Sequence, residues 1–358
     1  MAEKNGTFFD LSFFTGRRVL ITGHTGFKGS WLARILADAG AEVAGYALPP
    51  APGAPLFGLL GLETDILHRT GDIRDFPGLL DLFRSFRPQL VFHLAAQPIV
   101  SEGYLHPRET FDTNLMGTVN LLECVRQTPG ICSVVAVTTD KVYESRPEPR
   151  READRLDGFD PYANSKSCAE LAAGCYRRCF LEAGEVSVST VRAGNVIGGG
   201  DLTPGRILPD CLRAAQTGED ILLRRPEAVR PYQHVLDALF AYLLLAVRQM
   251  DDPGLAGAYN IGPHPQDCLT AQALAQLFLD TWGPTASTVQ LQGASFPEDG
   301  YLALSTEKFS RALGWRPVWD IQTAVGKTVE WDKCRQAGGD VLTLTRRQVR
   351  SYLQSIPW

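Results

Sequence analysis

The amino-acid sequence predicts an α/β protein in which a doubly wound parallel sheet is followed by a smaller, mixed α/β unit at the C-terminus. Short apolar segments alternate with helical segments over the first half of the 358-residue chain. The apolar segments are nearly continuous, which is typical of strands that helices cover on both faces. After about residue 196 this alternation gives way to helical segments with short strands between them, which marks the second unit.

Five apolar segments are expected to form strands of the sheet: residues 18–22, 42–46, 90–94, 133–137 and 188–191. Between the first two, residues 27–39 carry apolar side chains at helical spacing, and Gly40 then ends the helix. Further helices are expected at residues 208–216, 235–250 and 270–282, and a loop at 49–55. We therefore expect one domain over residues 1–195 and a second over 196–358, with part of 231–262 returning to the first.

Composition excludes several classes of protein. The net charge is −5 and no basic run stands out, so binding to nucleic acid is not expected. The eight cysteines form no Cys-x-x-Cys pair, so no metal site is expected. Residues 1–11 lack the pattern of a signal peptide, and no apolar stretch is long enough to span a bilayer. Free thiols and these absences favour a cytoplasmic protein away from membranes.

A glycine-rich turn follows the first expected strand and opens the first expected helix. Such a turn brings backbone close to a pyrophosphate at a helix N-terminus, which is how Rossmann-type domains hold a dinucleotide. The alternative is a loop that needs small residues. The expected cofactor-contacting residues of this turn are Gly23, Thr25, Gly26, Phe27, Lys28 and Gly29.

The second expected strand ends in Gly45-Tyr46-Ala47-Leu48, without the acidic residue that selects NAD and without an arginine for a 2′-phosphate. This position therefore leaves NAD and NADP both open. Asp72 and Ile73 lie where the chain could reach the adenine, although Asp72 could equally be a turn residue.

Tyr162 and Lys166 are spaced four residues apart, so on a helix they share one face. A lysine ammonium beside the phenol should lower the pKa of the tyrosine, which could then act as a base toward a hydroxyl group. The alternative is an exposed helical pair.

Five motifs together resemble the extended short-chain dehydrogenases that modify nucleotide sugars. They are Gly23-x-x-Gly26-x-x-Gly29, His93-Leu94-Ala95-Ala96, Asn114-x-x-Gly117-Thr118, Tyr162-x-x-x-Lys166 and Arg192-x-x-Asn195. The resemblance implies NAD as cofactor and adds Leu94, Ala95, Ala96 and Asn114 to the residues that contact it. It also implies a homodimer, or a higher homo-oligomer, paired through residues 114–126 and 162–181.

The segment Thr139-Asp140-Lys141 makes the resemblance more specific, because it is similar to the corresponding segment of the CDP-glucose 4,6-dehydratases of this family. That likeness implies a lyase that removes water from CDP-glucose, giving CDP-4-keto-6-deoxyglucose. The implied catalytic residues are Thr139, Asp140, Lys141, Tyr162 and Lys166. Read alone, Asp140 and Lys141 would be a solvated ion pair on a turn.

Asn195, Arg206 and Arg230 are the candidates for the substrate diphosphate, because a guanidinium binds phosphate oxygens in pairs. Arg206 could instead belong to a surface loop. Gly103 and Leu202 depart from the pattern of the family, in which a serine and a tryptophan are expected. Two rival functions are another nucleotide-sugar dehydratase or epimerase of the same fold, and a dinucleotide-binding sensor without chemistry.

Overall fold

The computed structural model describes residues 10–53, 55–181, 186–291, 293, 297 and 299–356. Residues 1–9 lie outside this range, so most of the segment 1–11, where no signal peptide is expected, is not described. In the described part, seven parallel strands form one sheet in the order β10-β6-β5-β4-β1-β2-β3. Their bounds are β1 Arg18–Thr22, β2 Glu42–Ala47, β3 Leu67–Thr70, β4 Leu90–His93, β5 Ser133–Val137, β6 Ser187–Ala193 and β10 Ala258–Ile261.

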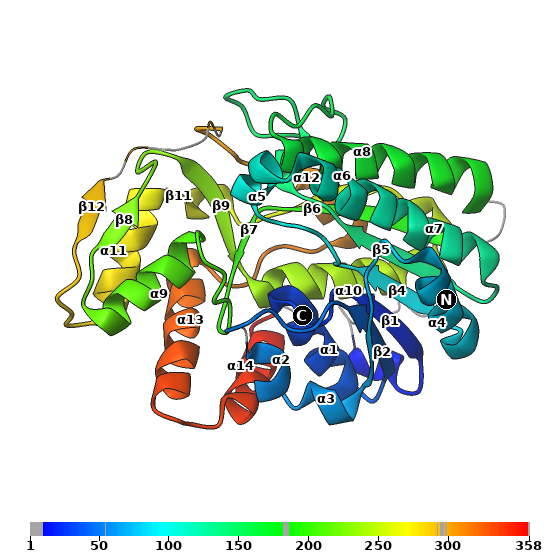
Figure 1. Cartoon of the computed structure of the whole chain (residues 1–358), viewed down its shortest axis with the longest axis horizontal. Coiled ribbons are helices and arrows are strands. Elements are labelled where there is room, and N and C mark those ends of the chain that lie inside the picture. The colour runs from blue at the N-terminus through cyan, green and yellow to red at the C-terminus, as the bar shows by residue number, and fades with distance from the viewer. Residues whose placement is uncertain are drawn as a thin grey trace, which may run out of the picture.

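Helices cover both faces of this sheet (Figure 1). Alternate residues of β1 show the two layers, since Val19 packs with Trp31 on one face and Leu20 packs with Leu121 on the other. The first face carries α1 Phe27–Asp38, α10 Val235–Asp251 and α14 Val341–Ser355, and the second carries α4 Phe76–Phe86, α7 Gly117–Gln127 and α8 Pro161–Tyr176. The α/β class and the doubly wound sheet are confirmed.

A second unit lies beside this sheet, on the left of Figure 1. Its strands form a three-stranded sheet, β11 Cys268–Thr270, β9 Val229–His234 and β7 Asn195–Ile197, and a parallel pair, β8 Ile221–Leu223 and β12 Val289–Leu291, within the described ranges. Three helices, α9 Ile207–Thr217, α11 Ala271–Trp282 and α13 Ile321–Gln336, enclose a separate apolar core around Leu212 and Phe278.

The remaining helices are short: α2 Leu56–Leu59, α3 Leu62–Asp65, α5 Val100–Leu105, α6 Pro107–Phe111 and α12 Glu307–Leu313. The chain visits the large sheet more than once, because α10, β10 and α14 all come after residues of the second unit. The division of the chain into two domains at residue 195 therefore remains a prediction. None of the helices in the described ranges has the length and apolar character that a membrane crossing needs.

Candidate active site

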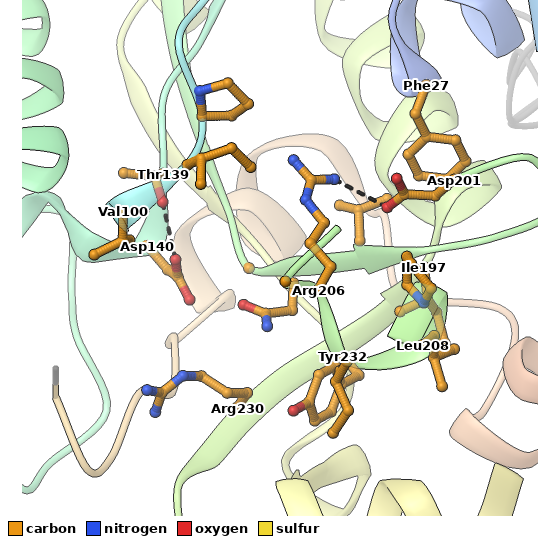
Figure 2. Close-up of a pocket in the computed structure, with 18 of the residues that line it drawn as sticks. Phe27, Val100, Thr139, Asp140, Ile197, Asp201, Arg206, Leu208, Arg230 and Tyr232 are labelled. Carbon is orange, nitrogen blue, oxygen red and sulfur yellow. Dashed lines mark hydrogen bonds and ion pairs between the residues drawn. The ribbon is translucent and has the colours of Figure 1, made fainter. Parts of the chain in front are cut away.

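A cavity of about 390 Å³ lies between the carboxyl ends of the sheet strands and the second unit. Figure 2 shows side chains from both units around it. In an open α/β sheet this edge is where ligands bind. Twelve of the residues selected from the sequence line it: Phe27, Lys28, Leu94, Ala96, Thr139, Asp140, Lys141, Tyr162, Lys166, Asn195, Arg206 and Arg230. Gly23, Thr25, Gly26, Gly29, Asp72, Ile73, Ala95 and Asn114 are not among its walls.

The glycine turn between β1 and α1 is as tight as the sequence predicts. Gly23 has a φ of 77°, and a Cβ on it would lie 2.7 Å from the Ala95 nitrogen. A Cβ on Gly29 would lie 2.1 Å from the Gly23 carbonyl oxygen. Gly26 is the N-cap of α1 and has no side chain to occupy the end of the helix. This bare helix end beside the cavity fits a pyrophosphate group.

Two predicted cofactor residues have partners within the protein. Asp72 accepts hydrogen bonds from the Arg74 guanidinium, at 2.6 Å for the closest pair, and these bonds lower the pKa of Asp72. Asn114 is fully buried, and its side-chain amide donates to the Gln97 carbonyl (3.0 Å) and to Ser165 Oγ (2.9 Å). Asn114 thus joins the segment after β4 to α8 behind the cavity wall.

The segment Thr139-Asp140-Lys141 follows β5 and forms a short 3₁₀ turn. Thr139 Oγ1 donates to Asp140 Oδ1 over 3.0 Å, as Figure 2 shows. Asp140 is 2% exposed, and its Oδ2 has no hydrogen-bond partner among the described residues. Burial raises the pKa of Asp140, although Lys141 and Arg230 oppose the shift. A carboxyl group in this environment favours its neutral form, which can donate a proton.

Tyr162 and Lys166 lie on α8, and both are buried. Lys166 Nζ donates to the Val137 carbonyl over 3.1 Å, and burial lowers the pKa of Lys166 to about 8 against the attraction of Glu170. Burial also raises the pKa of Tyr162 to about 12, against a hydrogen bond with Thr139. The pKa of Tyr162 in the protein alone is therefore higher than the sequence predicts, because desolvation of the phenolate outweighs the neighbouring positive charges.

The start of α8 is fixed by local contacts. Asp160 caps the helix by accepting from the Ala163 N–H over 2.8 Å, and Pro161 occupies the first helical position. Gly103 of α5 packs against the same turn, since a Cβ there would lie 3.0 Å from the Tyr162 nitrogen. The departure at Gly103 therefore brings α5 close to the backbone of the tyrosine.

The predicted substrate residues come from the second unit. Arg206 forms an ion pair with Asp201 over 3.0 Å at one side of the cavity (Figure 2). Arg230 is 6% exposed and donates to the carbonyls of Val229 (2.9 Å) and Asp299 (2.6 Å). Lys28 adds another cation, and burial together with Arg206 and Lys166 lowers its pKa to about 7. This wall is suited to an anionic ligand.

The polar residues of the walls that were not selected from the sequence include Asp201, Arg224, Arg225 and Tyr232. Asp201 directly follows the glycines that end at Gly200, whose φ is 84°, and that turn was a signal for it. The position of Arg224 and Arg225 depends on how β8 pairs with β12, which the sequence does not indicate. Within the described ranges, no three His, Cys, Asp or Glu side chains are grouped so that they could hold a metal ion.

Comparison with known proteins agrees with this geometry. Residues 19–262 match the model of the NAD dependent epimerase/dehydratase family. The chain is 41% identical to the CDP-glucose 4,6-dehydratase of Salmonella typhimurium, over 97% of this chain and 99% of that protein. It also resembles two structures solved with NAD. The dTDP-glucose 4,6-dehydratase of Streptomyces venezuelae is 26% identical with a TM-score of 0.79, over 91% of this chain and 99% of that one.

The UDP-glucose 4-epimerase of Thermus thermophilus is 28% identical with a TM-score of 0.77, and the likeness covers 87% of this chain and 98% of that one. The family match spans more than half of the chain and includes the glycine turn, β5 and α8. The chain belongs to the NAD dependent epimerase/dehydratase family.

Proposed function

We propose that this protein is a lyase that converts CDP-glucose to CDP-4-keto-6-deoxyglucose and water, with NAD as its cofactor. The observation that carries the proposal is the placement of Thr139, Asp140 and Lys141 in one cavity with Tyr162 and Lys166. An epimerase needs the hydroxyl group, the tyrosine and the lysine, but loss of water also needs an acid and a base for C6 and C5. The choice of CDP-glucose rests on the 41% identity to the Salmonella typhimurium enzyme.

The residues of the glycine turn fit NAD, because the bare N-terminus of α1 accepts a pyrophosphate and Gly23 and Gly29 leave no room for side chains. Phe27, Leu94 and Ala96 would line the route from that turn to the catalytic groups. When bound, NAD supplies the acceptor for the C4 hydride and returns the hydride at C6. Because the hydride must return, the cofactor has to stay bound through the cycle.

Tyr162 takes the proton of the C4 hydroxyl as the sugar is oxidised, and Thr139 donates a hydrogen bond to the same oxygen. Because the pKa of Tyr162 is about 12 in the protein alone, its deprotonation in the complex depends on positive charge beside the phenol, which Lys166 supplies and bound NAD⁺ would add to.

Lys141 then removes the C5 proton, which the 4-keto group has made acidic. Asp140 donates its proton to the C6 oxygen, the C6–O bond breaks and water leaves. The raised pKa of Asp140 suits this donor role. Lys141 then returns its proton to C5, and the hydride at C6 would come from bound NAD, so the sugar has lost one water in total.

Asn195, Arg206 and Arg230 line the part of the cavity that the second unit contributes, and we assign them to the nucleotide diphosphate. Arg206 is about one-third exposed, so its guanidinium can exchange the Asp201 carboxylate for phosphate oxygens.

Purified protein incubated with CDP-, dTDP-, UDP- and GDP-glucose, with and without added NAD⁺, tests the proposal by mass spectrometry. We expect loss of one water from CDP-glucose alone. Loss from another sugar of the panel would keep the mechanism and overturn the nucleotide assignment. No loss from any of them, in protein shown to bind NAD⁺, would reject the dehydratase and favour an epimerase or a sensor.

We also infer a cytoplasmic homodimer that pairs through the helices α7 and α8. The exposed apolar side chains on or beside these helices include Met116, which precedes α7, Leu171 on α8 and Phe180 just after it. Light scattering on the wild-type protein and on Leu171→Asp tests this inference, because the dimer should become a monomer in the variant.

A further inference from the structure

A fully buried ion pair lies behind the proposed catalytic residues. Arg192 Nη2 of β6 is 2.8 Å from Glu170 Oε2 of α8, and the two side chains are 4% and 2% exposed. A buried ion pair costs desolvation energy, and apolar residues often stabilise a fold equally well in its place. Folding stability alone is therefore a weak reason for these charges.

Glu170 accepts hydrogen bonds from a residue that directly follows β5 and from a residue on the neighbouring strand β6. Its Oε1 accepts from Thr138 Oγ1 over 2.5 Å, and its Oε2 accepts from Thr190 Oγ1 over 2.7 Å. Thr138 directly precedes the segment Thr139-Asp140-Lys141, so the carboxylate holds the point where β5 passes into that segment.

The arginine of the pair holds the other end of the same segment. Arg192 Nη1 donates to the Tyr143 hydroxyl oxygen over 2.7 Å, and that hydroxyl donates to Asn260 Oδ1 over 2.6 Å. Tyr143 lies two residues after Lys141. One ion pair thus fixes the backbone on both sides of the acid and the base.

Glu170 also lies on the helix that carries the other catalytic pair. It follows Lys166 by four residues and Tyr162 by eight, so the three share one face of α8. The carboxylate is therefore placed to set the position of the 139–141 segment relative to the tyrosine and the lysine.

We propose that Glu170 is a positioning residue of the dehydration reaction, which with Arg192 holds the 139–141 segment against α8 and places its carboxylate one helical turn from Lys166. This inference rests on the proposed function and deepens it. Glu170 is the largest attraction that counters burial in setting the pKa of Lys166 at about 8.

Three other described side chains close to Lys166, those of Lys28, His93 and Tyr162, do not provide this negative charge. Lys28 of α1 is close enough for Lys166 to lower its pKa, so the two cations repel each other. His93 of β4 has its pKa lowered to about 3 by burial and then by Lys166, and is neutral. Tyr162, with a pKa of about 12, is neutral in the protein alone.

The test is the pH dependence of turnover in Glu170→Gln, which keeps the size and one acceptor oxygen but removes the charge. We expect kcat near neutral pH to fall about tenfold, with KM for CDP-glucose changed by less than about twofold. We also expect the loss of activity at alkaline pH to begin about one unit lower, because Lys166 loses its proton more easily. Thr190→Val is the matched control, since it removes one hydrogen bond to Glu170 and keeps the charge, and its alkaline limb should not move.

An alkaline limb at the wild-type pH in Glu170→Gln, or an equal shift in Thr190→Val, would overturn the proposal. If Glu170→Gln does not fold, Thr138→Val decides: a lower kcat at unchanged KM supports the positioning role, and wild-type kcat overturns it. If the wild-type protein turns over no nucleotide sugar, the proposed function fails separately. In that case the inference is tested by the pH dependence of NAD⁺ affinity. This pH dependence should shift in Glu170→Gln and stay at the wild-type position in Thr190→Val, and any other result would overturn the inference.

Discussion

At the scale of single residues, Asp140 combines burial with a carboxylate oxygen that has no partner among the described residues. In the proposed reaction this group gives its proton to the departing oxygen. Asp140→Asn keeps the hydrogen bond from Thr139 but cannot supply that proton. We expect kcat to fall by about 100-fold or more, measured as product by mass spectrometry, with unchanged NAD⁺ affinity. Turnover at the wild-type rate would exclude Asp140 as the acid.

Lys141 is the proposed base for C5, so its removal should separate the two halves of the reaction. Lys141→Ala should still oxidise C4 and then stall, since the C5 proton stays in place. Absorbance of reduced nicotinamide should accumulate on adding CDP-glucose while no water is lost. The exposed Lys333→Ala is the control and should behave as wild type. Normal product formation in Lys141→Ala would rule out this role.

The sequence predicts the residues of the site better than their ionisation. Thr139 comes just after an expected strand, and the carboxyl ends of parallel strands meet at one edge of a sheet. The sequence therefore predicts that the site lies at this edge, with Tyr162 and Lys166 on the helix that comes next in the chain. It does not predict that the pKa of Tyr162 rises, since burial of the phenol depends on how elements distant in the chain, such as α5, pack around the start of α8. The Glu170–Arg192 pair was also missed, because its two residues lie 22 positions apart and meet only in the folded sheet.

At the scale of elements, the passage from β1 through the glycine turn into α1 depends on close backbone contact. A methyl group on Gly29 would collide with the Gly23 carbonyl at 2.1 Å, whereas one on Gly26 would meet that oxygen at 3.4 Å. We expect Gly29→Ala to lower the free energy of unfolding by about 3 kcal/mol and to abolish NAD⁺ binding.

Gly26→Ala is the matched variant and should unfold at the wild-type temperature. Calorimetry gives both the unfolding temperature and the binding of NAD⁺. Equal stability losses in the two variants would show that the turn is not held by this contact.

The five strands and four helices expected from apolar patterning are all present, with ends within a few residues of the prediction. The strand β3 was missed because it lies at the edge of the sheet and carries polar residues. The helices α13 and α14 were missed as well. The apolar stripe of α13 is weak because residues such as Thr328 and Asp332 are buried on it, and sequence patterning reads those as exposed.

At the scale of the whole molecule, Asp237 of α10 joins distant parts of the chain. Its Oδ1 accepts from the Val318 N–H (2.7 Å) and from the Tyr352 hydroxyl of α14 (2.8 Å). Burial raises the pKa of Asp237 to about 7, so the folded state holds this proton more tightly than the unfolded chain does. Its contribution to stability is therefore greatest at acid pH and decreases as the pH rises toward 7.

We predict that the free energy of unfolding of the wild-type protein falls by about 2 kcal/mol more than that of Asp237→Asn between about pH 5 and pH 8. The reason is that the asparagine side chain has no proton to lose in this range. Urea denaturation of both proteins at the two pH values measures the difference. Parallel changes in the two proteins would show that Asp237 does not titrate in this range.

The path of the chain between the two units has a further consequence. A cut after residue 195 would remove β10 from the edge of the large sheet and both α10 and α14 from one of its faces. Neither fragment would retain a complete core. Recombination could not exchange the second unit, to which we assign the nucleotide sugar, as one continuous segment, because several junctions would have to be joined at once. We therefore expect new sugar specificities in such a protein to come from substitutions among the residues that line the cavity, with the two interleaved units kept together.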